Sequence, residues 1–502
     1  MCSQRAGTPL IHSLERARSL RVAVIGAGMA GILAVIRLRE SGMTDVTCFE
    51  KADDLGGTWR ENTYPGIACD VPSHVYSYSF APNPDFSRMF SPGGEIHEYL
   101  RQVAADHGVL DVVRLGEEVL TMSHADQGWS VVTTSGDQGR FDVVIAATGV
   151  LHHPRLPDID GLDTFEGRIF HSARWDHSVE LTGRRVGVVG TGSTAVQITG
   201  AVIDDVARLS LFQRTPQWIM PVDNQPIAAE QRTAFREDPE RLRELREFLE
   251  RSFAENFADA VVDADSEALA KIEATCRTHL EMQVSDPELR HRLTPDYRAA
   301  CKRLVVSGDF YDAIQRPNAV LVTDPIDRIE PGGIRTLDGT LHELDVIVLA
   351  TGFHVDKFVR PIALVGPDGR SLDDAWASGP VAYLSISIPG FPNLFLLNGP
   401  NGPVGNFSLI QVAELQMDYI LQLVELLRDG RATTVEARAD ATAAFEADRI
   451  EAARGTVWVT GCNSWYLDAH GVPAAWPWKF QRFREVMATP DLSAFELQGG
   501  TT

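Results

Sequence analysis

The chain has 502 residues, 44% of them hydrophobic and 23% charged, which is ordinary for a folded globular protein of about three domains. Its formal net charge of −23 argues against nucleic acid and anionic membranes as partners, because like charges repel. No apolar run reaches the roughly 18 residues that a membrane span needs, and the first twenty residues lack the apolar centre of a signal peptide. We expect residues 1–20 to form a flexible tail.

A glycine-rich turn follows the first predicted strand, residues 21–25, and opens an apolar helix. Gly26 permits a tight turn, Gly28 lets the backbone approach a pyrophosphate, and Gly31 lets the helix pack closely on the strand. The next predicted strand ends at Glu50, 19 residues after Gly31, where a carboxylate can accept hydrogen bonds from ribose hydroxyls. Together these features predict a Rossmann-like dinucleotide-binding unit.

A conspicuous run of residues leads from the first unit toward a second glycine-rich loop. It has the spacing Phe165-x-Gly167-x-x-x-His171-x-x-x-Trp175 and is followed by Asp176. Two dinucleotide loops in one chain imply two nucleotides and electron transfer between them. We expect this linker to fix the relative orientation of the two units, although a loop with incidental aromatic residues is the alternative.

The second loop repeats the first pattern. A strand leads to the loop Gly190-Thr191-Gly192-Ser193-Thr194-Ala195, and a helix follows this loop. The following strand ends at Arg214 instead of an acid. An arginine can pair with a ribose 2′-phosphate that an acid would repel, so this position favours NADPH over NADH. A solvated arginine at the end of a strand is the alternative.

The segment from about residue 226 to residue 300 is polar and helical in pattern. Its apolar residues recur every three or four positions, which predicts an amphipathic helix on the body of the protein. We interpret the segment as a helical insertion in the second unit, either packed on the body or covering the substrate. The periodic residues are Leu242, Leu245, Leu249, Phe253 and Phe257.

Two predicted strands end in the same Ala-Thr-Gly sequence, one before Gly149 and one before Gly352. We expect the chain to leave the first unit near Gly149 and to return near Gly352, so that the second unit is inserted in the first. The fold class is therefore α/β, with two Rossmann-like dinucleotide-binding domains. We place the first domain at residues 21–150 and 336–502 and the second at residues 151–335. A long helix is also predicted from Ser408 to Leu427, and its N-terminus could direct positive charge at a bound flavin.

The cysteines are scattered, and none stands in a C-x-x-C or C-x-x-x-x-C pair. This spacing argues against a zinc site, a disulfide framework and a redox dithiol. It fits a protein of the reducing cytosol. We therefore expect no metal, no disulfide framework and a cytoplasmic location. The six residues are Cys2, Cys48, Cys69, Cys276, Cys301 and Cys462.

The linker run, together with the pattern Gly57-x-Trp59-x-x-x-x-Tyr64-Pro65-Gly66-x-x-x-Asp70, resembles the type I Baeyer–Villiger monooxygenases, which are class B flavoprotein monooxygenases. The resemblance extends from Arg21 to about Phe483, with Asp176 where this family more often has proline. It implies FAD in the first unit and NADPH in the second. It also implies insertion of one oxygen atom from O2 next to a ketone carbonyl, through a C4a-peroxyflavin, to give an ester or a lactone.

The resemblance also implies roles for individual residues. Arg303 would stabilise the negative charge that develops on oxygen, because an arginine stays charged and gives up no proton. Asp70 would pair with Arg303 and fix its rotamer. Lys302 and Arg214, with Thr215 beside them, would hold the 2′-phosphate of NADP. Trp465 matches a loop tryptophan that covers the nicotinamide half of NADP, with a packed indole as the alternative.

On the flavin side, the resemblance adds residues of the second pattern to the first glycine loop. Trp59 and Tyr64 would flank the flavin, although plain aromatic packing is the alternative. The other residues that we expect to contact FAD are Lys51, Gly57, Thr58 and Asp70.

Other functions remain open at this point. Flavin monooxygenases that oxygenate sulfur or nitrogen resemble this architecture, but their linker usually has another aromatic residue where this chain has Trp175. A pyridine nucleotide–disulfide reductase would need a cysteine pair, and a nucleotide-sensing protein would need no coupled linker. The sequence leaves open whether the ketone is cyclic, aryl or linear, its regioselectivity, and the oligomeric state.

Overall fold

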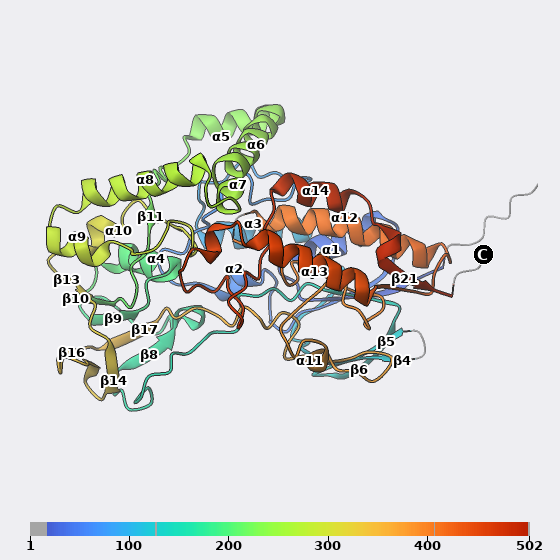
Figure 1. Cartoon of the computed structure of the whole chain (residues 1–502), viewed down its shortest axis with the longest axis horizontal. Helices are drawn as coiled ribbons and strands as arrows, with labels where there is room; N and C mark the ends of the chain where they lie inside the picture. Colours follow the sequence, from blue (N-terminus) through green and yellow to red (C-terminus); the bar gives the residue numbers. More distant parts are fainter. Residues whose placement is uncertain (1–17, 126–127, 406, 500–502) are drawn as a thin grey trace, which may run out of the picture.

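The computed structural model describes residues 18–125, 128–405 and 407–499 (Figure 1). Most of the predicted flexible tail, residues 1–17, therefore lies outside the described residues. Next to the tail, Arg18 donates a backbone hydrogen bond of 2.9 Å to Arg428, and Leu20 is buried. Among the described residues, no helix combines the length and the apolar character that a membrane crossing needs. They also contain no group of three or more His, Cys, Asp or Glu residues that could hold a metal.

The first unit is built on a five-stranded sheet in the order β19-β7-β1-β2-β3, in which every pairing is parallel. Its strands are β1 (Arg21–Ile25), β2 (Asp45–Phe49), β3 (Val113–Arg114), β7 (Val143–Ala146) and β19 (Leu394–Leu396). Parallel strands that are buried on both faces have continuous apolar sequences, which is why β1 and β7 could be located from sequence. The helices beside the sheet are α1 (Met29–Glu40), α3 (Gly93–Asp106) and α12 (Leu409–Arg428).

Smaller elements of the first unit surround this sheet. A second sheet has the order β18-β4-β5-β6, and the C-terminal part adds helices along α12 (Figure 1). These elements are α2 (Thr58–Glu61), β4 (Val119–Ala125), β5 (Gly128–Thr133), β6 (Gly136–Phe141), β18 (Ala363–Val365), α11 (Leu372–Ala375), β20 (Thr434–Ala437), α13 (Ala439–Ala453), α14 (Phe480–Ala488) and β21 (Phe495–Gln498).

The second unit has its own parallel five-stranded sheet, in the order β13-β10-β9-β17-β8. An antiparallel sheet, β14-β15-β16, lies at one side of it (Figure 1). The predicted α/β class with two such units is thus confirmed. The elements are β8 (Arg168–His171), β9 (Arg185–Val189), α4 (Ser193–Val202), β10 (Arg208–Phe212), α10 (Phe310–Ile314), β13 (Ala319–Val322), β14 (Ile326–Glu330), β15 (Gly333–Thr336), β16 (Leu341–Glu343) and β17 (Val346–Leu349).

The boundary that we placed near residue 336 is too early. Strand β17 pairs with both β8 and β9, so it still belongs to the second sheet. By strand pairing, the second unit extends to Leu349. Both copies of the Ala-Thr-Gly sequence follow a buried strand. The apolar sequence of such a strand does not show which sheet it pairs with, and so it could not fix the boundary.

The helical insertion extends along one side of both units (Figure 1). Leu249 and Phe253 pack against the core of the first unit, whereas Leu280 and Leu293 are buried in the core of the second. Its position across the two units gives it the packing role that the sequence predicted. The helices are α5 (Ala229–Glu237), α6 (Pro239–Phe253), α7 (Asp259–Val261), α8 (Glu267–Gln283) and α9 (Pro287–Leu293), with a π-helical turn at Ala254–Ala258. Two short strands flank the insertion and pair with each other, β11 (Ile219–Met220) and β12 (Val305–Val306).

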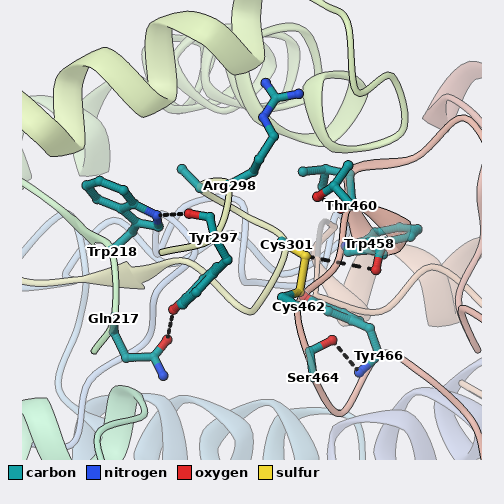
Figure 2. The surroundings of a disulfide bond; sticks show 12 residues. Gln217, Trp218, Tyr297, Arg298, Cys301, Trp458, Thr460, Cys462, Ser464 and Tyr466 are labelled. Atoms are coloured by element: carbon teal, nitrogen blue, oxygen red, sulfur yellow. Dashed lines mark hydrogen bonds between the residues drawn. A yellow bond between two sulfur atoms is a disulfide. The ribbon is translucent and has the colours of Figure 1, made fainter. Parts of the chain in front are cut away.

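The spacing of the cysteines argued against a disulfide framework, yet the structure contains a disulfide. Cys301 and Cys462 are joined, with their Cα atoms 6.1 Å apart (Figure 2). They are separated by 161 residues, so spacing motifs, which detect cysteines that are close in sequence, could not find them. Disulfides are rare in a reducing cytosol. The cysteines therefore no longer support the prediction of a cytoplasmic location.

Candidate active site

The first glycine loop has the geometry that a dinucleotide needs. Gly26 has φ +97°, in a region that favours glycine, and a Cβ added at Gly31 would lie 1.8 Å from the carbonyl oxygen of Gly26. Gly28 is the N-cap of α1, whose first turn contains no acidic residue. Backbone N–H groups at a helix N-terminus without nearby negative charge suit a pyrophosphate. The loop therefore fits the flavin dinucleotide predicted for it.

Glu50 follows β2 and is buried. Its carboxylate accepts hydrogen bonds from the backbone N–H of Ala27 at 2.7 Å and of Ala52 at 3.0 Å. The side chain is thus held against the glycine loop, and its remaining lone pairs are available to a ribose. Lys51, next in sequence, is exposed and lies 3.8 Å from Glu61. Contacts of both residues with FAD stay predictions.

The segment around Gly57 lies against the first loop. The N–H of Gly56 donates to the carbonyl of Ala27 at 2.9 Å. A Cβ added at Gly57 would come within 2.9 Å of the Cα of Gly28, so the two backbones approach as only glycine permits. Thr58 and Trp59 begin α2 beside this contact, and the indole N–H of Trp59 donates to the hydroxyl of Tyr76 at 3.2 Å.

Tyr64 lies elsewhere. Its ring is buried in the core of the second unit, and its hydroxyl donates to the side chain of Gln197 on α4 at 2.9 Å and accepts from Thr194 at 3.4 Å. Burial raises the pKa of Tyr64 to about 12. Nearby Gly66 also contacts α4, because a Cβ there would lie 2.5 Å from the carbonyl oxygen of Gln197. Of the two interpretations of Tyr64, the structure favours packing, here between the two units.

Arg303 and Asp70 form the central ion pair of the site. The guanidinium donates from Nη2 to Asp70 Oδ1 at 2.7 Å and from Nε to Asp70 Oδ2 at 3.1 Å. Its Nη1 donates to the carbonyl oxygen of Gly405, in the loop that leads to α12. Both side chains are about three-quarters buried, with exposed fractions of 24% for Arg303 and 26% for Asp70. A two-point contact of this kind fixes the plane of the guanidinium.

The surroundings keep Arg303 charged. Burial alone would lower its pKa, but Asp70 and the hydroxyl of Tyr466 outweigh this effect and raise the pKa. Tyr76, the partner of Trp59, is close enough for its pKa to be influenced by Arg303 and Asp70, although burial is what chiefly raises it. Trp59 begins α2 next to Gly57 and hydrogen bonds to Tyr76, whose pKa responds to Arg303 and Asp70, so this segment connects the first glycine loop with the surroundings of the cation.

The second glycine loop has the same features as the first. Gly190 has φ +123°, and a Cβ there would lie 2.4 Å from the carbonyl oxygen of Ala350. Gly192 is the N-cap of α4, which begins at Ser193 and Thr194 and has no acidic residue in its first turn. Nothing lies within 4 Å of a Cβ added at Gly192. This open helix N-terminus fits a second pyrophosphate.

Two cations meet where a 2′-phosphate is expected. Arg214 follows β10 and is exposed, and its positive charge, after burial, is a cause of the lowered pKa of Lys302. Neither side chain forms an ion pair within the described part of the chain. Thr215 lies at the second loop, because its carbonyl oxygen accepts from the hydroxyl of Thr191 at 2.7 Å. Two adjacent cations that repel each other form a site that an anion would stabilise.

Trp465 is 40% exposed and stacks on Tyr466, with ring centroids 4.2 Å apart. The alternative of a packed core indole is therefore wrong for this structure. Contact with NADP stays a prediction.

The strand of the linker run belongs to the sheet of the second unit. Phe165 is buried in the second unit, and a Cβ at Gly167 would meet both the Phe165 ring and a backbone oxygen at 2.5–2.6 Å. His171 ends β8 opposite Leu349 of β17, and its Nδ1 accepts from the N–H of Ala173 at 3.1 Å. Burial lowers the pKa of His171. The imidazole is thus a buried group of the linker.

Residues after the strand contact the first unit. Trp175 packs edge-on against Phe170 of β8, with ring centroids 5.1 Å apart. Arg174 lies 3.6 Å from Glu61 of α2, and His177 hydrogen bonds to Thr63 at 2.7 Å. The linker therefore contacts both units, which supports its predicted role in their relative orientation.

Sequence reasoning missed several residues of this site. Tyr466 and Gly405 both contact Arg303, and Gln197 and Glu61 contact the residues that join the two units. Tyr466 follows Trp465 in sequence, so the loop was recognised, but no spacing relates a loop residue to an arginine more than 160 positions earlier. Gly405, with φ +84°, was visible only as part of a loop rich in glycine and proline.

Comparison with known proteins identifies the family. A family model described as flavin-binding monooxygenase-like matches residues 19–231. An uncharacterized monooxygenase of Mycobacterium tuberculosis is 47% identical over 95% of this chain and 96% of its own length. A Baeyer–Villiger monooxygenase of Streptomyces coelicolor is 40% identical over 95% of this chain and 92% of its own length.

Solved structures agree with these relatives. Cyclohexanone monooxygenase from Rhodococcus sp. Phi1 bound to NADP+ has a TM-score of 0.85 and 31% identity, over 96% of this chain and 99% of that one. The complex of OTEMO with FAD and NADP has a TM-score of 0.84 and 27% identity, over 96% and 100% of the two chains. The relatives cover almost the whole length of the chain, and the structure has the two glycine loops and the linker that the sequence predicted. The chain belongs to the type I Baeyer–Villiger monooxygenases, flavoprotein enzymes whose cofactors are FAD and NADP.

Proposed function

We propose that the enzyme uses NADPH and O2 to insert one oxygen atom next to the carbonyl of a ketone, giving an ester or a lactone. The observation that supports this proposal is the Arg303 guanidinium, held by Asp70 and Gly405. Bound FAD, once reduced, would supply the activation of dioxygen. The chain itself must stabilise negative charge on oxygen, orient the ketone and exclude water.

Arginine suits the first of these tasks. Its charge persists at every working pH, and its raised pKa keeps it from protonating a nearby oxygen anion. Asp70 occupies Nε and one Nη2 hydrogen, and the carbonyl of Gly405 takes one hydrogen of Nη1. The N–H groups that Asp70, Gly405 and Tyr466 do not occupy are available to an anion that forms beside the ring system. A preorganised donor of this kind stabilises charge without reorganising during the reaction.

The use of NADPH is supported by the second loop. Arg214 and Lys302 form a cationic pair near its end, where the ribose 2′-phosphate that distinguishes NADPH from NADH would lie. Lys302 and Arg303 are adjacent in the segment just before β12. One of these neighbours therefore serves the nucleotide and the other serves the oxygenation.

Ketones are proposed as substrates because the structural relatives include cyclohexanone and steroid monooxygenases. Sulfide or amine oxygenation is the competing outcome. It proceeds by attack of a neutral nucleophile and so needs a stabilising cation less than attack on a carbonyl does. Loss of Arg303 should therefore reduce ester formation more than it reduces sulfide or amine oxygenation.

The test is product analysis with FAD, NADPH, O2 and a panel of cyclic, aryl and linear ketones, applied to the wild type and to Arg303→Ala. We expect the variant to be reduced by NADPH but to form no ester, and to retain more sulfoxide formation than ester formation. Arg303→Lys retains charge but not the two-point contact with Asp70, so it should recover little activity. Ester formation at the wild-type level by Arg303→Ala would remove Arg303 from this role. A wild type that oxidises NADPH but forms no ester from any ketone would refute the proposed function.

A further inference from the structure

Tyr466 completes the surroundings of Arg303 from a different part of the chain than Asp70 and Gly405. Its hydroxyl lies close enough to the guanidinium to raise the pKa of Arg303, and it packs so tightly on Gly405, whose carbonyl accepts from Arg303, that a Cβ there would lie 1.9 Å from it. The ring is buried between Trp458, at a centroid distance of 5.2 Å, and Trp465, at 4.2 Å. The hydroxyl is therefore placed by packing on three sides.

The disulfide links the segment of Arg303 to the loop of Tyr466. Cys301 is two residues before Arg303, and Cys462 is four residues before Tyr466. Figure 2 shows the bridge between these segments, with Trp458 and Tyr466 beside Cys462. Without the bridge, the two segments would be connected only through a chain of about 160 residues. With it, a short covalent path joins them, with two residues from Arg303 back to Cys301 and four from Cys462 on to Tyr466.

We propose that Tyr466 is a positioning residue for Arg303 and that the Cys301–Cys462 disulfide keeps it in contact, so that thiol–disulfide exchange regulates oxygen transfer. This inference rests on the proposed function, because it assumes that Arg303 stabilises the reaction. Asp70 holds one edge of the guanidinium, and Tyr466 acts with the carbonyl of Gly405 against rotation about that edge. A guanidinium that rotates away still leaves FAD to be reduced, but the activated oxygen is then released as hydrogen peroxide.

A dithiol reductant supplies the electrons that reduce the Cys301–Cys462 disulfide. One of its thiolates attacks a sulfur of the bridge, the S–S bond breaks, and the second thiolate resolves the mixed disulfide. Two electrons and two protons pass to Cys301 and Cys462, which become thiols, and the reductant becomes a disulfide. Both sulfurs belong to buried residues, with exposed fractions of 0% and 7%, so the loop must open before the reductant reaches them. The rate of reduction therefore reports opening of the loop.

The hydroxyl is tested with Tyr466→Phe, which retains the ring and its packing. We expect NADPH oxidation, the KM for NADPH and FAD content to stay within about twofold of wild type. The fraction of turnover that yields ester should fall about tenfold and be replaced by hydrogen peroxide, since a hydrogen bond to a charged group is lost. Tyr419→Phe is the matched control, because Tyr419 is buried and its hydroxyl has no hydrogen-bond partner among the described residues. An unchanged ester fraction in Tyr466→Phe would overturn the positioning role.

The bridge is tested with Cys462→Ser and with wild type treated with dithiothreitol. The matched control is Cys276→Ser, which removes a free thiol buried in the same apolar cluster as the bridge. In the protein without NADP, we expect faster hydrogen exchange in residues 457–467 for the variant and for the reduced wild type, but not for the control. Both should also lose ester fraction, and reoxidation of the wild type should restore it. If reduction changes neither hydrogen exchange in residues 457–467 nor the fraction of turnover that yields ester, the disulfide does not hold Tyr466 in place.

Thiol titration of the unfolded protein measures the bridge directly. Reduction of the Cys301–Cys462 bridge should raise the number of reactive thiols by two, to all six cysteines of the chain. Six before reduction would show that the bridge does not form. Thiol titration and hydrogen exchange need no ketone, so they test the disulfide independently of the proposed function. A wild type that makes no ester refutes the proposed function, whereas normal coupling in Tyr466→Phe within an ester-forming enzyme refutes only this inference.

Discussion

Asp70 and Arg303 show how one residue depends on another for its function. Asp70→Asn retains the shape of the side chain but replaces a two-point ionic contact with a neutral one. A charge-assisted contact contributes about 1.5–3 kcal/mol, and partial exposure of this pair favours the lower end. We therefore expect ester formation to fall about tenfold, with flavin reduction by NADPH largely retained. Stopped-flow reduction and product yield would measure the two separately, and Asp45→Asn, at an exposed carboxylate, is the control.

The cationic pair at the second loop gives a prediction about nucleotide choice. Lys302→Ala and Arg214→Ala should each raise the KM for NADPH about tenfold, because a charge-assisted contact with the 2′-phosphate is lost. The KM for NADH, which lacks this phosphate, should change little, and kcat should stay near wild type. Arg316→Ala, at an exposed arginine paired with Asp204 in the same unit, should affect neither nucleotide. Equal losses for NADPH and NADH would place the phosphate elsewhere.

At the level of residues, the sequence predicted the site residues that belong to motifs and missed those that only tertiary packing brings to the site. Asp70 and Arg303 are separated by 233 positions, yet both were identified by their resemblance to family patterns, and the structure brings them together. Tyr466, Gly405 and the disulfide depend on how one loop packs on another. No local periodicity or propensity contains that information.

Among the elements, the helical insertion is held to the first unit by a buried histidine. His74 lies edge-on to Phe235 of α5, with ring centroids 5.5 Å apart, and edge-on to Phe86 at 5.8 Å. Burial lowers the pKa of His74 to about 4, and the charge of Arg246 on α6 acts in the same direction. The folded protein therefore holds this imidazole neutral, whereas the unfolded chain protonates it near its ordinary pKa of about 6.5.

The sign of the pH dependence follows from this lowered pKa. The stability due to neutral His74 is complete above about pH 6.5 and is lost as the pH falls toward 4. At pH 5 the loss is about 2 kcal/mol, since a tenfold difference in proton affinity between the folded and unfolded chains corresponds to about 1.4 kcal/mol. His74→Phe should reduce the acid-induced fall in melting temperature between pH 7.5 and 5, whereas His470→Phe, at an exposed position, should not. If His74→Phe has the same pH dependence as wild type, the imidazole is not the sensitive group.

The strands were the elements that sequence predicted best. The strand expected at residues 21–25 is β1, and β7, β9 and β17 lie where strands were expected before Gly149, Gly190 and Gly352, because buried parallel strands combine high β-propensity with turn-forming residues after them. Strand β17 was nevertheless assigned to the wrong unit. Its neighbours β8 and β9 lie more than 150 residues earlier, and pairing at that distance depends on the whole sheet.

In the whole molecule, the position of the two units relative to each other is set by small contacts far from both glycine loops. Tyr64 and Gly66 of the first unit touch α4 of the second, and the linker contacts α2 through Arg174 and Glu61. The sequence predicted that the second unit is inserted in the first, since the order of the motifs required it. The surfaces that meet could not be predicted, because a contact between units has no periodic signature.

Gly66 provides a test of how closely electron transfer depends on this arrangement. It has φ +81°, and a Cβ added to it would lie 2.5 Å from the carbonyl oxygen of Gln197, which is backbone and cannot move aside without moving α4. Gly66→Ala should therefore shift the second unit while leaving the core of each unit intact. A displacement of about 1 Å can cost about 100-fold in rate when reacting groups must meet. We expect flavin reduction by NADPH to slow at least tenfold, with FAD content and the KM for NADPH little changed. Gly42→Ala is the matched control, because Gly42 has φ +87° and nothing within 4 Å of the added Cβ, so it carries the same backbone strain without the contact. If flavin reduction is equally fast in Gly66→Ala and Gly42→Ala, any slowing is due to backbone strain alone. The contact between Gly66 and α4 then does not set the distance between the two nucleotides.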